Sequence, residues 1–174
     1  MVTLRRLTED DAEELAPMAG QTFIDGWASV IGREAASGYV AEYLHPERLR
    51  AEIQNPTNYF AGAFDTETSA IAGYARLDYG KPAPECVSGR KPVVLQRLYV
   101  AAAFRGAGVA DSLLNHCREI ARQGGFDTLW LETDPRNERA WRFYEKRGFV
   151  AVGYTTYRYP DGENPHVRIL VGDV

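Results

Sequence analysis

The sequence predicts an α+β fold in which a mostly antiparallel sheet is flanked by helices. Short alternating or β-branched runs, typical of strands, occur at the start, in the middle and at the end of the chain. Amphipathic stretches separate them, and residues 93–133 have the pattern strand, helix, strand, which predicts a parallel pair joined by a right-handed crossover. No internal repeat or linker divides the 174 residues, so we expect a single domain over residues 1–174.

Composition and charge exclude several classes of protein. The 45% apolar and 25% charged residues are typical of a globular chain, and the net charge of −4 argues against a nucleic-acid partner. No apolar run approaches the roughly 18 residues of a membrane span, and no signal-peptide core is present, so we expect a cytoplasmic protein without a membrane partner. Cys86 and Cys117 are too few for a disulfide framework and lack metal-ligand spacing, so no metal is expected; Cys117 has the spacing of a buried helix position.

The first quarter of the chain predicts one strand followed by helices. The alternating stretch "VTLRRL" predicts the strand, and Thr8 followed by acidic residues predicts a capped helix start. We expect this helix to be interrupted or kinked near Pro17, because proline lacks the N–H that a helix needs. A helical pattern returns over residues 27–55, with breaks at His45-Pro46 and Asn55-Pro56.

The rest of the chain predicts a hairpin and then alternating strands and helices. Two alternating runs flank the polar turn "DTETS" and predict an antiparallel hairpin over residues 58–80, and a loop rich in proline and glycine follows at 80–92. The later elements are a strand at 93–100, a helix from Val109 to Gly124-Gly125, a strand at 126–133, a short helix closed by Gly148, and strands at 150–159 and 167–172.

The stretch "FRGAGVADSLL" places two glycines at the start of an amphipathic helix. Small residues there leave the N–H groups of the first helical turn uncovered, and the positive end of the helix dipole favours an anion at the same place. The spacing Arg-x-x-Gly-x-Ala matches neither the dinucleotide-binding fingerprint nor the P-loop. The turn therefore predicts either a phosphate site of another kind or a turn that serves only tight packing.

A second motif favours the phosphate interpretation. Residues 137–149 have the pattern Asn-x-x-Ala-x-x-x-Tyr-x-x-x-Gly-Phe. Together with Arg-x-x-Gly-x-Ala over residues 105–110, it resembles the GNAT superfamily, the Gcn5-related N-acetyltransferases that use acetyl-coenzyme A (acetyl-CoA). The resemblance implies the GNAT fold, a mixed and mostly antiparallel sheet of about seven strands flanked by about four helices, with strands 4 and 5 splayed.

The resemblance also implies where acetyl-CoA binds. The main chain of the strand around Tyr99 would bond the pantetheine amides as a neighbouring strand does. Asn137 would contact the pantetheine arm or cap its helix, and its helical face continues through Ala140 to Tyr144. The residues implied in coenzyme binding are Leu98, Tyr99, Val100, Arg105, Gly106, Ala107, Gly108, Val109, Ala110, Asn137, Ala140 and Tyr144.

Transfer of an acetyl group to an amine needs a base and a proton donor. An alkyl amine of pKa about 10.4 is almost entirely ammonium at pH 7, and the departing thiolate is helped by a proton. Tyr144 is the candidate acid, with a core aromatic as the alternative. Glu132 lies twelve residues earlier, a spacing similar to the Glu/Tyr pair of the ribosomal-protein alanine N-acetyltransferases, and is the candidate base. Its alternative is a sheet-end carboxylate bound to solvent or arginine.

The preceding strand departs from some histone-type relatives. Where they carry a glutamate, this chain has Val93, Val94 and then Gln96, so a direct glutamate base from that strand is not expected. Gln96 would orient a water or the substrate, or bond its neighbours in the strand. Weaker candidates for the base are Asp134, Glu85 and His166, the last in the sequence context of a surface loop.

The acceptor pocket is expected to form from the N-terminal helices and the loop at 80–92. Aromatic side chains would form a wall for a cationic or apolar amine, or would be buried in the core; they are Phe23, Trp27, Tyr39 and Tyr43. The chain is similar to a bacterial branch of polyamine or sporulation-regulator-like acetyltransferases, which implies a small amine such as a polyamine. The alternatives are a protein N-terminus or lysine as acceptor, and a non-catalytic acetyl-CoA sensor. The sequence leaves open whether two copies form a homodimer.

Overall fold

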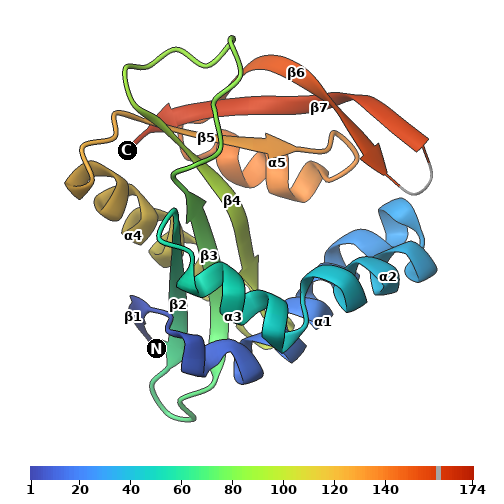
Figure 1. Cartoon of the computed structure of the whole chain (residues 1–174), viewed down its shortest axis with the longest axis vertical. Helices are drawn as coiled ribbons and strands as arrows, with labels where there is room; N and C mark the ends of the chain where they lie inside the picture. The colour runs from blue at the N-terminus through green and yellow to red at the C-terminus, as the bar shows by residue number, and fades with distance from the viewer. Residues whose placement is uncertain (160–161) are drawn as a thin grey trace.

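The computed structural model describes residues 1–159 and 162–174, which contain a seven-stranded sheet in the order β1-β2-β3-β4-β5-β7-β6 (Figure 1). The strands are β1 (Val2–Arg6), β2 (Asn58–Asp65), β3 (Ile71–Asp78), β4 (Pro92–Val100), β5 (Thr128–Thr133), β6 (Val150–Tyr159) and β7 (Gly162–Asp173). The α-helices are α1 (Ala12–Ile31), α2 (Arg33–Tyr43), α3 (Pro46–Gln54), α4 (Val109–Gln123) and α5 (Glu138–Glu145), with short 3-10 turns η1 (Glu9–Asp11) and η2 (Ala102–Phe104). The predicted α+β fold is confirmed.

The sheet is antiparallel except at its centre, as predicted. The hairpin of β2 and β3 pairs Asn58 with Asp78 and Tyr59 with Leu77, and β3 continues antiparallel to β4. The crossover through α4 makes β4 and β5 parallel, and β5 then pairs with β7 and β7 with β6, both antiparallel. Helix α4 forms this crossover and packs on one face of the sheet, so it shields that face of the parallel pair from solvent.

The parallel pair is short, and the two strands then separate. Their register extends only from Pro92 opposite Thr128 to Val94 opposite Trp130, although β4 continues to Val100. In Figure 1, β2–β4 run vertically whereas β5–β7 cross the top of the molecule, so the two parts of the sheet diverge. The predicted splay of the fourth and fifth strands is therefore confirmed.

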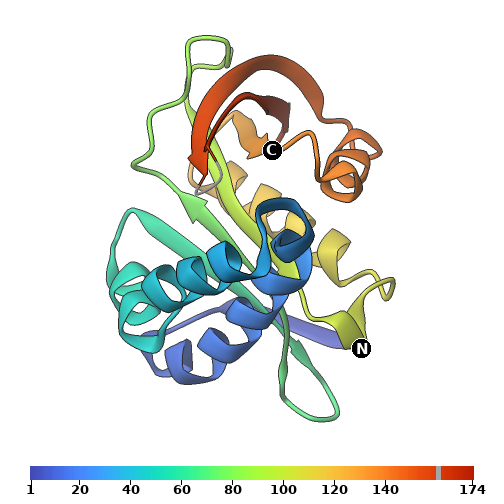
Figure 2. The same cartoon turned by 90° about the vertical axis from the view of Figure 1, so that its right-hand side faces the viewer.

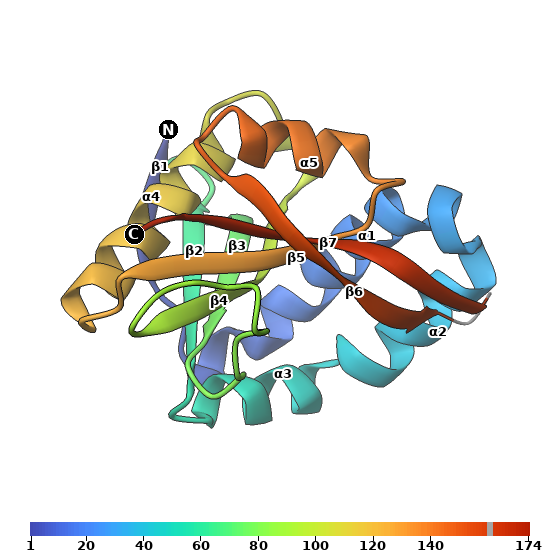
Figure 3. The ribbon, with the colours of Figure 1, turned by 90° about the horizontal axis from the view of Figure 1, so that it is seen from above.

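Helices cover the two faces of the sheet with separate apolar clusters (Figures 2 and 3). One cluster joins α1–α3 to β2 and β3 and includes Leu15, Leu49 and Phe60; the other places α4 and α5 against the opposite face and includes Leu113 and Leu129. Burial of each large side chain stabilises the fold by about 1.5–3 kcal/mol. Cys117 is fully buried on the inner face of α4, as predicted.

Of the two alternatives expected at Pro17, an interruption or a kink, the interruption was wrong. Helix α1 runs without a break from Ala12 to Ile31, with Pro17 in its second turn. The proline removes one helical N–H, but the face formed by Leu15, Ala19 and Phe23 is buried on both sides of it. Burial of this continuous face outweighs the loss of one hydrogen bond.

The helical pattern over residues 27–55 is divided once more than predicted. Gly32, with φ +86°, separates α1 from α2, a backbone conformation that favours glycine. The predicted X-Pro breaks are confirmed, because α2 ends at Tyr43 and α3 extends only from Pro46 to Gln54. The described residues thus form five α-helices rather than about four. No helix among them is long and apolar enough to cross a membrane.

Candidate active site

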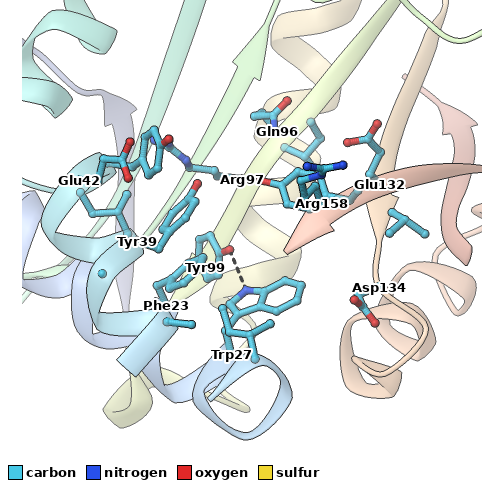
Figure 4. Close-up of a pocket in the computed structure, with 18 of the residues that line it drawn as sticks. Phe23, Trp27, Tyr39, Glu42, Gln96, Arg97, Tyr99, Glu132, Asp134 and Arg158 are labelled. Carbon is cyan, nitrogen blue, oxygen red and sulfur yellow. Dashed lines mark hydrogen bonds between the residues drawn. The ribbon is translucent and has the colours of Figure 1, made fainter. Parts of the chain in front are cut away.

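A cavity of about 670 Å³ lies beside the splayed strands (Figure 4). Its lining comes from α1 and α2 on one side and from β3 to β7 on the other. The labelled lining residues are Phe23, Trp27, Tyr39, Glu42, Gln96, Arg97, Tyr99, Glu132, Asp134 and Arg158. The volume falls within the range of pockets that enclose a small molecule.

The glycine turn before α4 has the geometry of an anion-binding loop. Gly106 and Gly108 have φ values of +83° and +79°, and a Cβ built at either position would meet no atom within 4 Å. Gly108 is the N-cap of α4, and the first helical bond runs from the Ser112 amide to its carbonyl. Among the described residues, the amides of Gly106, Gly108, Val109 and Ala110 donate to no backbone carbonyl. Both glycines are needed for the backbone conformation, and the space outside them is open.

Arg105 adopts a role that the sequence did not indicate. Its Nε donates to the Val100 carbonyl at 3.2 Å, and its Nη2 lies 3.1 Å from Oδ2 of Asp25. The side chain therefore joins the end of β4 to α1, and the positive charge faces a carboxylate of α1. Asp25 was missed because nothing in the local sequence places that turn of α1 beside the loop.

The strand β4 presents a free edge towards β5 beyond Val94. Its other edge pairs with β3, where the register shifts so that Leu95 faces Leu77 and Arg97 faces Arg76. Gln96 is the extra residue of this β-bulge and lines the cavity. The β5-facing main chain from Gln96 onward, including Leu98 and Tyr99, has no strand partner among the described residues. The carbonyl of Val100 is already taken by Arg105.

Tyr144 lies in the core on the face covered by α4 and α5. Its ring packs edge-on against Phe143 and Phe149, with centroids 5.1 and 5.4 Å away. Only 9% of the residue is exposed, and its hydroxyl has no hydrogen-bond partner within residues 1–159 and 162–174. Burial raises the pKa of Tyr144 above the ordinary value of 10.0, so the phenol stays protonated at neutral pH. Tyr144 is thus a core aromatic, and its phenol keeps its proton at neutral pH.

Glu132 lies on the other face of β5. It faces away from Leu129 and Leu131, which belong to the core beneath α4, and it lines the cavity. Its Oε2 is 2.9 Å from Nζ of Lys81, in the loop after β3. Loop packing of this kind has no sequence signal, so Lys81 was missed.

Asn137 takes the second of its two predicted roles. As the N-cap of α5, its Oδ1 accepts a hydrogen bond from the Ala140 amide at 3.2 Å. This bond satisfies one of the free donors at the start of α5 and fixes the face that carries Tyr144. The side chain is therefore occupied in the helix cap.

Of the three weaker candidates for the base, one lines the cavity and two do not. Asp134 is buried and lines the cavity, but its oxygens accept bonds from the Arg136 amide at 2.8 Å, the Arg136 side chain at 2.9 Å and Asn164 at 3.0 Å. Glu85 lies exposed in the loop between β3 and β4. His166 is exposed on β7 rather than in a loop, beside the Tyr154 ring. Neither Glu85 nor His166 lines the cavity.

An aromatic wall is present on the helical side of the cavity, as predicted. The rings of Phe23 and Tyr39 stack with centroids 4.2 Å apart, and Tyr43 packs against Tyr39 at 4.7 Å. Trp27 donates from Nε1 to the Tyr99 hydroxyl at 3.3 Å. Phe23, Trp27 and Tyr39 belong to the apolar cluster beneath α1 and also line the cavity, whereas Tyr43 lines the cavity without belonging to that cluster.

The fold and this site define a class of enzyme before any relative is considered. A glycine turn with free amides, a splayed parallel pair and an adjoining cavity with a carboxylate fit an acyltransferase that uses a nucleotide-linked thioester. The profile of the acetyltransferase (GNAT) family matches residues 27–149, so the chain belongs to the GNAT family. It is an N-acetyltransferase that uses acetyl-CoA as acetyl donor.

Individual relatives agree with this membership. An uncharacterized N-acetyltransferase of Mycobacterium tuberculosis is 29% identical over 160 residues, which cover 91% of this chain and 96% of the relative. An uncharacterized N-acetyltransferase of Lactobacillus delbrueckii subsp. lactis is 26% identical over 86% of this chain and 84% of its own. Among solved structures, the PaiA N-acetyltransferase of Thermoplasma acidophilum, in complex with coenzyme A, has a TM-score of 0.81 at 21% identity, covering 100% of this chain and 99% of that one.

The residues present here fit acetyl-CoA. The open space outside Gly106 and Gly108 and their free amides suit a diphosphate, since anions bind at helix N-termini. The free edge of β4 suits an extended arm that carries amides. Within the described residues no group of three histidine, cysteine, aspartate or glutamate side chains could hold a metal ion.

Proposed function

We propose that this protein acetylates the primary amino group of a small molecule that enters the cavity between α1–α2 and β4–β7. The observation that carries the proposal is the position of the cavity, which adjoins the splay of β4 and β5 and includes Glu132 in its lining. Tyr39 and Tyr43 of α2 and Tyr157 of β6 line it from opposite sides, which favours a small acceptor over a peptide. The aromatic wall and Glu132 suit an acceptor that arrives as an ammonium ion, the polyamines among them.

The loop and the splay would position the donor. The amides of Gly106, Gly108, Val109 and Ala110 would hold the diphosphate, and the free main chain of β4 around Leu98 would hold the pantetheine arm. Acetyl-CoA supplies an acetyl group already activated as a thioester. Binding at two fixed points would restrict the position of the acetyl carbon. The transfer then takes place within one complex and does not depend on a chance collision of the two substrates.

Glu132 and Tyr144 would divide the proton transfers between them. The Glu132 carboxylate takes a proton from the ammonium group, so that the neutral nitrogen can form a bond to the acetyl carbon. The C–S bond breaks, and the Tyr144 hydroxyl gives its proton to the departing sulfur. Gln96, which lines the cavity at the bulge of β4, would orient the acceptor or a water between it and Glu132.

An acceptor screen tests the proposal. Release of free thiol from acetyl-CoA would be followed over spermidine, amino acids, amine-bearing antibiotics and N-terminal peptides. Turnover with small amines but not with peptides is the expected result. Preference for peptides would favour the protein N-terminal or lysine alternative, and acetyl-CoA binding without turnover on any acceptor would favour the sensor alternative.

A further inference from the structure

Tyr74, Arg97 and Tyr99 form one wall of the cavity, which we call its floor. Their side chains carry hydrogen-bond donors that the acetyl transfer described above does not use. Across β3 and β4, Tyr74 pairs with Tyr99 and Arg76 with Arg97, so these four side chains lie on the face that α1–α3 cover. Tyr74, Arg97 and Tyr99 also line the cavity. No local sequence pattern indicates this set, because the strand register brings its members together.

Arg97 is buried but only partly satisfied. Its side chain is 9% exposed, and it donates to Glu52 of α3 from Nη1 at 2.5 Å and from Nη2 at 3.3 Å. Glu52 is shared with Arg76 at 3.3 Å and Arg48 at 3.5 Å, so three guanidinium groups surround one carboxylate. A guanidinium has five N–H donors, and Arg97 makes only these two hydrogen bonds among the described residues.

Two phenol groups beside Arg97 also lack an acceptor. The Tyr74 hydroxyl is fully buried and has no hydrogen-bond partner within the described residues. The Tyr99 hydroxyl accepts from Trp27 at 3.3 Å, but its own proton has no acceptor in the same part of the chain. Buried donors are normally paired, so an unpaired cluster in the floor of a cavity points to a ligand oxygen.

The opposite end of the cavity has the reverse character. Figure 4 shows Arg97 extending towards Tyr39 and Glu42 of α2, whereas Glu132 projects from β5 on the far side of Gln96. Glu132 offers carboxylate oxygens to an ammonium group, and the floor offers N–H and O–H donors to an anion. The cavity therefore has donors at the end that carries Arg97 and Tyr74 and a carboxylate at the other end. Its charges are mixed, because Glu42 also lines the side with Arg97. Glu132 in turn contacts Lys81 and shares the lining with Arg158 (Figure 4).

We propose that the acceptor is an amine that also carries a carboxylate, as an amino acid or a small derivative of one does. The carboxylate accepts hydrogen bonds from Arg97 and Tyr74, and the amine lies towards Glu132. This proposal rests on the acetyl transfer proposed above and narrows its acceptor class. A polyamine would bring only donors to a floor that already consists of donors, which disfavours it.

Matched pairs of acceptors test the role of the carboxylate. Each amino acid of a panel would be compared with its methyl ester and with the amine left by its decarboxylation, all as acceptors of the same enzyme. We expect kcat/KM to fall roughly 10- to 100-fold when the carboxylate is lost, the range for a hydrogen bond to a charged group. Equal or higher kcat/KM for the decarboxylated amines or for spermidine overturns the carboxylate proposal while leaving acetyl transfer to amines intact.

Tyr74→Phe tests the floor itself. The ring packing on Phe60 and Tyr99 is retained and only the unpaired hydroxyl is removed, so the variant should fold with unchanged or higher stability. We expect its kcat/KM to fall about 10-fold for the amino acid and to stay unchanged for the decarboxylated partner. The matched control is Tyr79→Phe, on the opposite face of the sheet beside Phe126. Equal loss on both members of a pair contradicts the proposal.

A binding measurement tests the carboxylate proposal independently of acetyl transfer. Calorimetric titration of the amino acid and its decarboxylated partner into the enzyme with coenzyme A needs no chemical step. Tighter binding of the carboxylated compound, lost in Tyr74→Phe, supports carboxylate binding at the floor even if no acetyl transfer is detected. Equal affinities for the two compounds overturn carboxylate binding at the floor even if acetyl transfer is robust.

Discussion

Glu132 and Tyr144 lie on opposite faces of the sheet. Glu132 projects from β5 into the cavity and contacts Lys81 at 2.9 Å, whereas Tyr144 is buried with α4 and α5 against the other face. The two are connected by the gap that opens where β4 leaves β5 after Val94. A base on the acceptor side and an acid on the coenzyme side are what a direct transfer through this gap needs, because the proton is removed at the nitrogen and returned at the sulfur.

Glu132→Gln is expected to lower kcat by roughly 100-fold or more, the usual contribution of a general base. Affinity for coenzyme A should not change, because Glu132 lies away from the glycine loop. The contact with Lys81 is partly exposed, with side-chain exposures of 32% and 23%, so its loss should change stability by less than about 1 kcal/mol. Steady-state kinetics and coenzyme titration measure both effects.

The control for that substitution is Glu138→Gln, which alters an exposed carboxylate on α5 whose one ion pair within residues 1–159 and 162–174 is with Arg142. It should leave kcat unchanged. If Glu132→Gln keeps wild-type kcat, the base must be sought elsewhere in the lining, first at the exposed Glu42.

Tyr144→Phe should lower kcat by roughly 10²-fold while the protein stays folded. The phenylalanine ring can retain the contacts with Phe143 and Phe149, and the hydroxyl it lacks has no partner among the described residues. Kinetics and thermal unfolding of the purified variant measure the two quantities, with the exposed Tyr154→Phe as control. Full turnover in the double variant Tyr144→Phe, Glu132→Ala would remove both residues from the mechanism.

The elements of the fold followed from local sequence, with exceptions at Pro17 and Gly32. Strand alternation, the "DTETS" turn and the X-Pro steps gave the strands, the hairpin and two helix boundaries. Pro17 misled because burial of the α1 face is a tertiary effect that propensity does not include. Gly32 was overlooked because a single glycine in a helical pattern can be tolerated or can end a helix, and its φ of +86° decides between them.

Some residues of the candidate site could be predicted from the sequence and others could not. The glycine turn and Tyr144 lie in contiguous motifs, so their placement could be expected from the chain alone. Lys81 beside Glu132, Asp25 beside Arg105 and the Tyr74 and Arg97 floor depend on contacts between elements far apart in sequence. Register across β3 and β4 and the packing of α1 on the loop create these contacts, and neither has a signature in one sequence.

Alkaline pH should destabilise the protein through its buried tyrosines. Burial raises the pKa of Tyr99 to about 12 and raises the pKa values of Tyr74 and Tyr144 as well, from an ordinary value of 10.0. The unfolded chain releases these protons first, so the stability is fully present below about pH 10 and is lost as the pH rises towards 12. Urea unfolding across this range, with tyrosinate absorbance recorded in parallel, measures the loss. Titration of all tyrosines near pH 10 without loss of stability would contradict it.

Gly108→Asp should weaken coenzyme binding by about 100-fold or more, because it places a carboxylate where the diphosphate is expected. Gly108→Asn is the matched control, since it has nearly the same shape without the charge. Both residues tolerate the left-handed backbone better than other side chains, the φ here is +79°, and no atom lies within 4 Å of the added Cβ. Both also serve well as N-caps, so neither variant should unfold. Calorimetric titration with coenzyme A should show a much larger loss for the aspartate than for the asparagine. Equal affinities for the two variants would mean that the amides at the start of α4 do not hold the diphosphate.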